Sequence, residues 1–217
     1  MRLQRYLAAA LAALLAGAVM AQSPHTHNHS FGDAQSWAKV FDDPARDAWQ
    51  KPHEVIQALA LKSDAVVADI GAGTGYFAVR LAHMLDKGRV YAVDVEPHMV
   101  RYLGDRAKKE GIGNLYAIRG TPGDPHLPAK VDMVLVADTY HHIGSRRAYF
   151  AKLAASLKPG GRVAIIDFTA TSKIGPPQAA RMTPESVKAE MTGAGYRLAT
   201  THDFLPNQFF LIFERNK

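Results

Sequence analysis

From residue 65 onward, short apolar runs alternate with stretches in which apolar side chains recur at helical spacing. The apolar runs predict strands near residues 65–70, 89–94, 114–119, 131–137 and 161–167. The stretches between them predict helices near residues 76–86, 97–110, 145–157 and 183–194. Strands that alternate with helices form a parallel sheet with helices on both faces. We therefore expect an α/β domain with three layers.

The end of the chain departs from this alternation. Two strand-like runs, residues 197–204 and 208–214, are joined only by Leu205-Pro206-Asn207. Because no helix separates them, they are expected to pair as an antiparallel hairpin. Earlier in the chain, Lys158-Pro159-Gly160-Gly161 predicts a sharp turn between a helix and a strand.

The segment before the first strand has its own pattern. A short helix is expected from Asp33 to Phe41, and Asp42-Asp43-Pro44 ends it. A second helix is expected near residues 53–61. We expect residues 33–61 to form a helical cover across the ligand pocket and residues 65–217 to form the core. Together they form a single domain, 33–217.

The first 21 residues have the pattern of a secretory signal peptide. A basic start, Met1 to Arg5, precedes an apolar run over residues 6–19 and a small-residue cleavage signal, Val19-Met20-Ala21. The apolar run is shorter than the roughly 20 residues of a membrane-spanning helix. We expect a periplasmic or secreted protein without a stable membrane span, and the alternative is an uncleaved anchor in the cytoplasmic membrane. Sequencing the mature N-terminus distinguishes the two.

Residues 22–32 are polar and read as a flexible leader. It contains His25, His27 and His29. These histidines either belong to a solvated linker or hold a transition metal loosely. The chain has no cysteine, so disulfides and protein thiols are excluded. Its net charge of +6 is spread along the sequence without a basic stripe, which gives no support for nucleic-acid binding.

The candidate chemistry centres on the stretch from Asp69 to Gly75, which follows the first predicted strand. Its glycines, Gly71, Gly73 and Gly75, let a ligand approach bare backbone, and the next helix offers free N–H groups to an anion. The dinucleotide fingerprint G-x-G-x-x-G would need a third glycine where Tyr76 stands. The pattern is instead D-x-G-x-G-x-G, which disfavours a nicotinamide-dependent oxidoreductase.

This motif, together with three later features, carries a family resemblance. The second strand ends in Asp94, the fourth is followed by Asp138 and His141-His142, and Leu157 to Arg162 reads LKPGGR. The order and spacing resemble class I S-adenosylmethionine-dependent methyltransferases over roughly residues 50–217. The resemblance implies a Rossmann-like, mostly parallel seven-stranded sheet with an antiparallel C-terminal hairpin. It also implies S-adenosyl-L-methionine as cofactor. No metal-ligating residues are predicted.

The resemblance assigns the cofactor to strand-end residues. It implies that Asp69 and the three glycines hold the methionine end, and that Asp94 accepts hydrogen bonds from both ribose hydroxyls. Glu96 is the alternative ribose acid. Asp124 is the candidate acceptor for the adenine amino group, and its alternative is a turn-forming Asp-Pro. Asp138 is expected at the same edge of the sheet, as a further cofactor-binding residue.

The expected reaction is methyl transfer to a small-molecule acceptor. A catalytic base is needed only if the acceptor must lose a proton. His141 and His142 are the candidates, with a structural role in the cofactor wall as the alternative. Because the N-terminus points to export while the cofactor is made in the cytoplasm, an exported binding protein that has lost the chemistry is the rival hypothesis.

Overall fold

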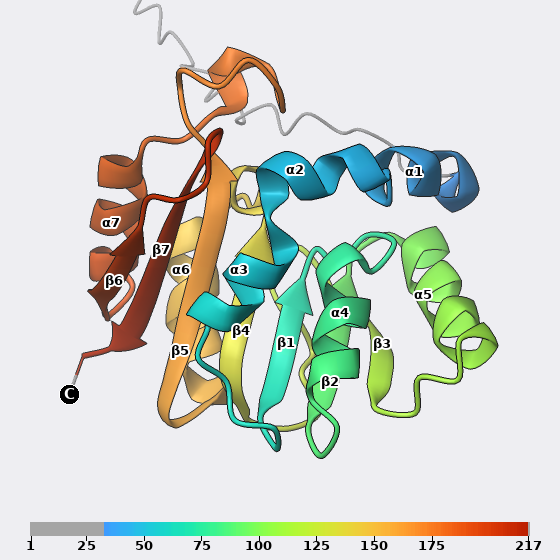
Figure 1. Ribbon diagram of the computed structural model, residues 1–217. Coiled ribbons are helices and arrows are strands. Elements are labelled where there is room, and N and C mark those ends of the chain that lie inside the picture. Colours follow the sequence, from blue (N-terminus) through green and yellow to red (C-terminus); the bar gives the residue numbers. More distant parts are fainter. Residues whose placement is uncertain (1–32, 217) are drawn as a thin grey trace, which may run out of the picture.

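A computed structural model describes residues 33–216 of the chain. The predictions of a signal peptide, an anchor and a histidine-containing leader therefore lie outside the described residues. The described part is built on one seven-stranded sheet (Figure 1) with the order β3-β2-β1-β4-β5-β7-β6. The strands are β1 (Val66–Ile70), β2 (Arg89–Asp94), β3 (Leu115–Arg119), β4 (Val131–Ala137), β5 (Leu157–Phe168), β6 (Tyr196–His202) and β7 (Gln208–Arg215).

Strand directions confirm the expected fold class. The pairs β3–β2, β2–β1, β1–β4 and β4–β5 are parallel, whereas β7 is antiparallel to both β5 and β6. The chain order reverses between β1 and β4, where β1 continues to β2 on one side and β4 to β5 on the other. In open α/β sheets the carboxyl ends of the strands at such a reversal form the ligand crevice.

Helices pack on both faces of the sheet and bury two separate cores. On one face lie α3 (Pro52–Ala58), α4 (Tyr76–Met84) and α5 (Pro97–Lys109), which contribute Val55, Leu81 and Leu103 to the first core. On the other lie α6 (Arg146–Leu153) and α7 (Pro184–Gly193), which contribute Phe150 and Met191 to the second. The sheet is therefore buried on both sides, as its near-continuous apolar strands require.

The LKPGGR stretch corrects one prediction. It belongs to β5 itself and is not a turn between a helix and a strand. Leu157 pairs with Val131 and Arg162 pairs with Met133, so the residues between them bulge out of the ladder. Gly160 has a φ of +76°, and a Cβ on Gly161 would lie 2.9 Å from the Lys158 carbonyl oxygen. The preceding helix ends at Leu153, earlier than predicted, and a 3₁₀ turn follows.

The segment before β1 forms α1 (Ala34–Phe41), a 3₁₀ turn over Pro44–Arg46, α2 (Asp47–Gln50) and α3. Of the predicted cover, residues 33–61, α1 and α2 run across the carboxyl ends of the strands (Figure 1), whereas α3 packs on one face of the sheet. From here on the name cover is therefore restricted to residues 33–51. Side-chain oxygens of Asp33 and Asp43 cap α1 and the 3₁₀ turn. Within residues 33–216, none of the helices has both the length and the apolar character needed to cross a bilayer.

Candidate cofactor site

Four strands carry an aspartate at their carboxyl ends, and these ends lie along one edge of the sheet. Asp69 is on β1, Asp94 ends β2, Asp138 follows β4 and Asp167 is on β5. Asp69, Asp94 and Asp167 are buried. This concentration of carboxylates at the crevice favours a ligand that carries positive charge. The sequence prediction named Asp69, Asp94 and Asp138 and missed Asp167.

The glycine loop after β1 adopts a backbone that only glycine takes easily. Gly71, Gly73 and Gly75 all have positive φ values, of 74°, 55° and 98°. A Cβ on Gly71 would lie 2.2 Å from the Thr139 hydroxyl oxygen. The backbone N–H of Gly71 also donates to the Val93 carbonyl oxygen at 2.8 Å. The loop is thus fixed between the ends of β2 and β4, with its glycines free of side chains.

Asp94 holds the glycine loop by its carboxylate. One oxygen accepts from the Gly73 backbone N–H and the other from the Glu96 N–H, each at 2.9 Å. Burial raises the pKa of Asp94, while both hydrogen bonds oppose the rise. Each oxygen keeps a further lone pair for a ligand hydroxyl. Its assignment to the ribose remains a prediction, now with a carboxylate oriented by two backbone groups.

Asp69 is nearly inaccessible, with 3% of its surface exposed. Burial, with a smaller contribution from Asp94, raises its pKa to about 7, and the guanidinium of Arg46 opposes the shift. An acid in this state is stabilised in its charged form when a cation arrives beside it. This fits the predicted role of Asp69 at the methionine end, which bears an ammonium group, and that role remains a prediction.

Asp138 belongs to a closed ring of hydrogen bonds that the sequence did not reveal. Its carboxylate accepts from Arg46 Nη2 at 2.8 Å and from Gln208 Nε2. Gln50 Nε2 donates to Gln208 Oε1 at 2.7 Å, and Gln50 Oε1 accepts from Arg46. Burial raises the pKa of Asp138 to about 6, with Arg46 opposing. We call these four residues the polar ring; it joins the cover to β4 and β7.

The cover lies directly on the glycine loop. A Cβ on Gly73 would lie 3.4 Å from the ring of Phe41. Asp42 accepts from the Thr74 hydroxyl at 3.1 Å and pairs with Arg106 at 3.0 Å. These contacts shield the loop from bulk solvent, which strengthens electrostatic interactions beneath the cover.

A cavity of about 450 Å³ opens beside the carboxyl ends of β2 and β3. Val95, 43% exposed, offers an apolar wall immediately after Asp94. The cavity is lined by Val95, Glu96, Arg119, Gly120, Thr121, Pro122 and His126. Its place next to the predicted ribose acid makes it the candidate adenine pocket. Asp124 is not among the lining residues: its carboxylate pairs with Lys152 at 2.7 Å and accepts from the His126 N–H. The adenine role of Asp124 stays a prediction.

His141 is paired with the acid that the sequence prediction missed. Its Nδ1 lies 2.9 Å from both carboxylate oxygens of Asp167, and its backbone N–H donates to the same group. Asp167 is fully buried, and the His141 side chain is 4% exposed. This pairing favours the tautomer with the proton on Nδ1, so that Nε2 is the basic atom. The ring centroids of His141 and His142 are 4.1 Å apart.

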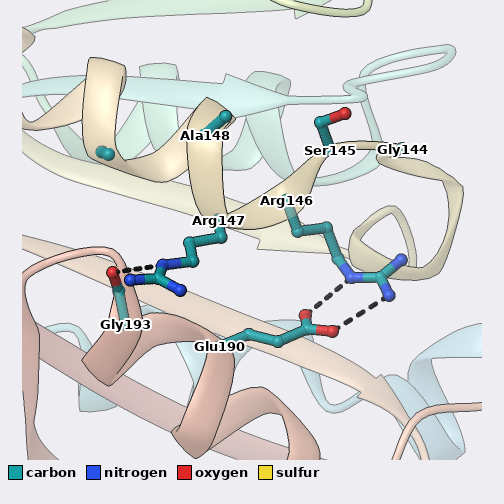
Figure 2. Close-up of a pocket in the computed structure, with 8 residues that line it drawn as sticks. Gly144, Ser145, Arg146, Arg147, Ala148, Glu190 and Gly193 are labelled. Carbon is teal, nitrogen blue, oxygen red and sulfur yellow. Dashed lines mark hydrogen bonds and ion pairs between the residues drawn. The ribbon is translucent and has the colours of Figure 1, made fainter.

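A second cavity, of about 680 Å³, lies between α6 and α7 and contains none of the predicted site residues. Figure 2 shows Arg146 and Glu190 facing each other across it, with hydrogen bonds of 2.7 and 3.1 Å. Arg147 Nε donates to the Gly193 carbonyl oxygen. Arg146 and Glu190 thus pair with each other, and Arg147 is held by a backbone carbonyl. Within residues 33–216 there is also no group of three or more histidine, aspartate or glutamate side chains arranged to hold a metal ion.

Comparison with known proteins gives the same class as the fold. A family model for methyltransferase domains matches residues 67–161. A malonyl-[acyl-carrier protein] O-methyltransferase of Hahella chejuensis is 29% identical over 97 residues, 45% of this chain and 34% of the relative. An uncharacterized methyltransferase of Mycobacterium bovis is 34% identical over 126 residues, 57% of this chain and 48% of the relative. The chain thus spans about a third to a half of the length of these curated relatives.

Solved structures extend the similarity beyond the matched segment. A SAM-dependent methyltransferase from Aquifex aeolicus aligns with a TM-score of 0.76 and 28% identity, covering 82% of this chain and 96% of that one. Magnesium protoporphyrin IX methyltransferase from Synechocystis, solved with bound S-adenosylhomocysteine (SAH), shares the fold at a TM-score of 0.66 and 16% identity, covering 86% and 95%.

The strand order, the glycine loop and these similarities support a class I S-adenosylmethionine-dependent methyltransferase, with S-adenosyl-L-methionine as its cofactor. The residues present fit this cofactor on three counts: glycines with no side chain at the loop, carboxyl groups with raised pKa values at the strand ends, and a cavity beside Val95. Asp94, Asp69 and the glycine loop would hold it.

Proposed function

We propose that the protein transfers a methyl group from S-adenosyl-L-methionine to a small-molecule acceptor. The observation that carries this proposal is the glycine loop, which Asp94 fixes beside an open cavity while the cover lies over it. The cofactor supplies a methyl group activated by a sulfonium. The residues of this chain contribute binding, orientation and exclusion of water.

A small-molecule acceptor is supported by the aromatic packing at the carboxyl end of β5. Trp49 of the cover and Phe168 of β5 lie with their ring centroids 5.7 Å apart, at the same strand end as His141 and Asp167. Gly175, in the segment after β5, packs so closely on the Phe168 ring that a Cβ there would lie 2.5 Å away. The cover and the segment after β5 therefore both pack on Phe168 at this strand end.

Calorimetry tests the proposed cofactor directly. We expect the intact protein to bind S-adenosyl-L-methionine and SAH, and NAD serves as the negative control. A protein that binds neither adenosyl compound is not a methyltransferase. A protein that binds both, yet transfers no labelled methyl group to any acceptor in a broad panel of small molecules, supports the rival hypothesis of a non-catalytic binding protein.

We further propose that His141 removes a proton from the acceptor and that Asp167 positions it. The Asp167 carboxylate holds the Nδ1 proton, which leaves Nε2 to act as the general base, and it stabilises the imidazolium that forms. The acceptor atom would then be one that carries an exchangeable proton. The alternative for His141, a place in the cofactor wall, predicts a different outcome in the following experiment.

Asp167→Asn and His141→Ala are each expected to lower kcat by roughly 10²- to 10⁴-fold, the usual contribution of a general base. Both variants should bind SAH as the wild type does, since neither group would touch the cofactor. Calorimetry and a transfer assay on the first acceptor identified measure the two quantities. An unchanged kcat, or a loss confined to SAH binding, contradicts the proposal. His142→Ala provides a neighbouring histidine for comparison.

A further inference from the structure

We propose that Arg46 binds the carboxylate of the cofactor's methionine end, and that the cofactor separates the Arg46–Asp138 ion pair when it binds. The inference rests on the proposed binding of S-adenosyl-L-methionine. In this exchange the cofactor's carboxylate takes the place of Asp138 beside the guanidinium. The cofactor's ammonium takes the place of the guanidinium beside Asp138. One internal ion pair is thus replaced by two pairs with the ligand.

The position of Arg46 supports this role. It ends the 3₁₀ turn of the cover, and its guanidinium lies 3.9 Å from the ring centroid of Tyr76. Tyr76 is the first residue of α4, directly after the glycine loop. The same guanidinium lies 2.8 Å from Asp138 at the end of β4. Arg46 therefore lies between the two strand ends, β1 and β4, that flank the reversal of the sheet.

The acidic groups of the crevice make a cation necessary for binding the cofactor's carboxylate. Asp69, Asp94 and Asp138 are three carboxyl groups at this edge, and each has a raised pKa, so a cation that arrives beside them stabilises their charged forms. They favour the cofactor's ammonium and sulfonium but repel its carboxylate. Arg46 acts electrostatically on both Asp69 and Asp138. A guanidinium is also the side chain whose fork of N–H groups matches a carboxylate in geometry.

Arg46 can take a new partner because its present hydrogen bonds do not use all of its N–H groups. It makes four hydrogen bonds, to Phe41 O, to Asp138 and twice to Gln50, for five available N–H groups. Its side chain is only 12% exposed, so a carboxylate that reached it would be shielded from solvent. Asp138 keeps the donor Gln208 when Arg46 turns to the ligand.

A purely structural role for Arg46 is the competing explanation. As a member of the polar ring, it fastens the cover whether or not a ligand contacts it. Loss of that fastening would weaken every ligand of the crevice alike. Direct binding of the carboxylate would weaken only ligands that possess one. The two roles are therefore separated by comparing ligands that share the adenosine and the sulfur but differ at the amino-acid end.

The experiment measures SAH and 5′-methylthioadenosine, which lacks the amino-acid end, by calorimetry on wild type and Arg46→Gln. We expect Arg46→Gln to lower the affinity for SAH by about 10- to 100-fold, because one charge-assisted pair is lost. The affinity for 5′-methylthioadenosine should not change. Arg80→Gln is the matched control. Arg80 also packs on Tyr76, at 4.1 Å, but pairs with Asp47 and is more exposed, so this variant should bind both ligands as the wild type does.

The outcomes separate this inference from the proposed function. If wild type fails to bind SAH, the proposed function is wrong. If Arg46→Gln weakens both ligands equally, or neither, Arg46 does not bind the carboxylate. Should Arg46→Gln fail to fold by circular dichroism, Arg46→Lys takes its place, because lysine keeps the charge but lacks the guanidinium fork. Arg46→Lys should still weaken binding of SAH more than binding of 5′-methylthioadenosine, and equal effects on the two ligands overturn the inference.

Discussion

Replacing Asp94 with alanine is expected to weaken binding of SAH by about 100-fold or more. The carboxylate would lose two hydrogen bonds from the ribose hydroxyls, each worth roughly 1.5–3 kcal/mol when the acceptor is charged. The glycine loop would also lose the acceptor that fixes the Gly73 N–H. Calorimetry on the folded variant measures the effect.

Glu96→Gln is the matched control for Asp94→Ala. Glu96 lies two residues further along, lines the same cavity and was the alternative ribose acid in the sequence prediction. Its backbone N–H, and not its carboxylate, contacts Asp94. We expect Glu96→Gln to change SAH affinity by less than about threefold, since no specific contact to a ligand hydroxyl is assigned to it. A larger loss in Glu96→Gln than in Asp94→Ala would exchange the two assignments.

Replacing Asp69 with asparagine is expected to stabilise the unliganded protein above pH 7. The folded pKa of Asp69, about 7, lies above the ordinary value of 3.8 that it has when unfolded. The folded state therefore binds the proton more tightly, and the stability that this gives is complete below about pH 4 and lost as pH rises through 7. Asparagine removes a buried charge at pH 8, for a gain on the order of 1–3 kcal/mol.

Urea unfolding at pH 5 and pH 8 measures this effect. The gain of Asp69→Asn over wild type should be larger at pH 8 than at pH 5, because the wild-type carboxyl is mostly protonated at pH 5. The same variant should bind SAH more weakly, since its side chain can no longer become a carboxylate beside the ligand's ammonium. A gain that is equal at both pH values contradicts the raised pKa.

Asp132→Asn is the control of opposite sign. Although burial opposes it, pairing with Lys158 at 2.6 Å and the Val66 N–H lower the pKa of Asp132. Its contribution is present above the unfolded pKa and is lost as pH falls through the folded value. Asp132→Asn should therefore destabilise the protein modestly near neutrality, and it lies away from the crevice.

The fold was predictable because its signals are local and periodic. Apolar strands that alternate with helices require a parallel sheet, and Leu205-Pro206-Asn207 is too short to be anything but the link of a hairpin. The LKPGGR stretch misled the prediction, because glycine and proline mark a bulge as readily as a turn. Only the pairing of β5 with β4 shows which one forms.

The candidate site was likewise predictable from the sequence only in part. The sequence by itself determined the glycine loop and the strand-end positions of Asp69 and Asp94, because backbone conformation and strand direction follow from neighbouring residues. The class of cofactor came from the resemblance of these motifs to a known family. The tertiary structure alone brought together Arg46 and Asp138, 92 residues apart, and Gln50 and Gln208, 158 apart. It also paired Asp167 with His141 and turned Asp124 toward Lys152. Polar side chains leave no periodic signal of their partners, so their pairing depends on how distant segments pack.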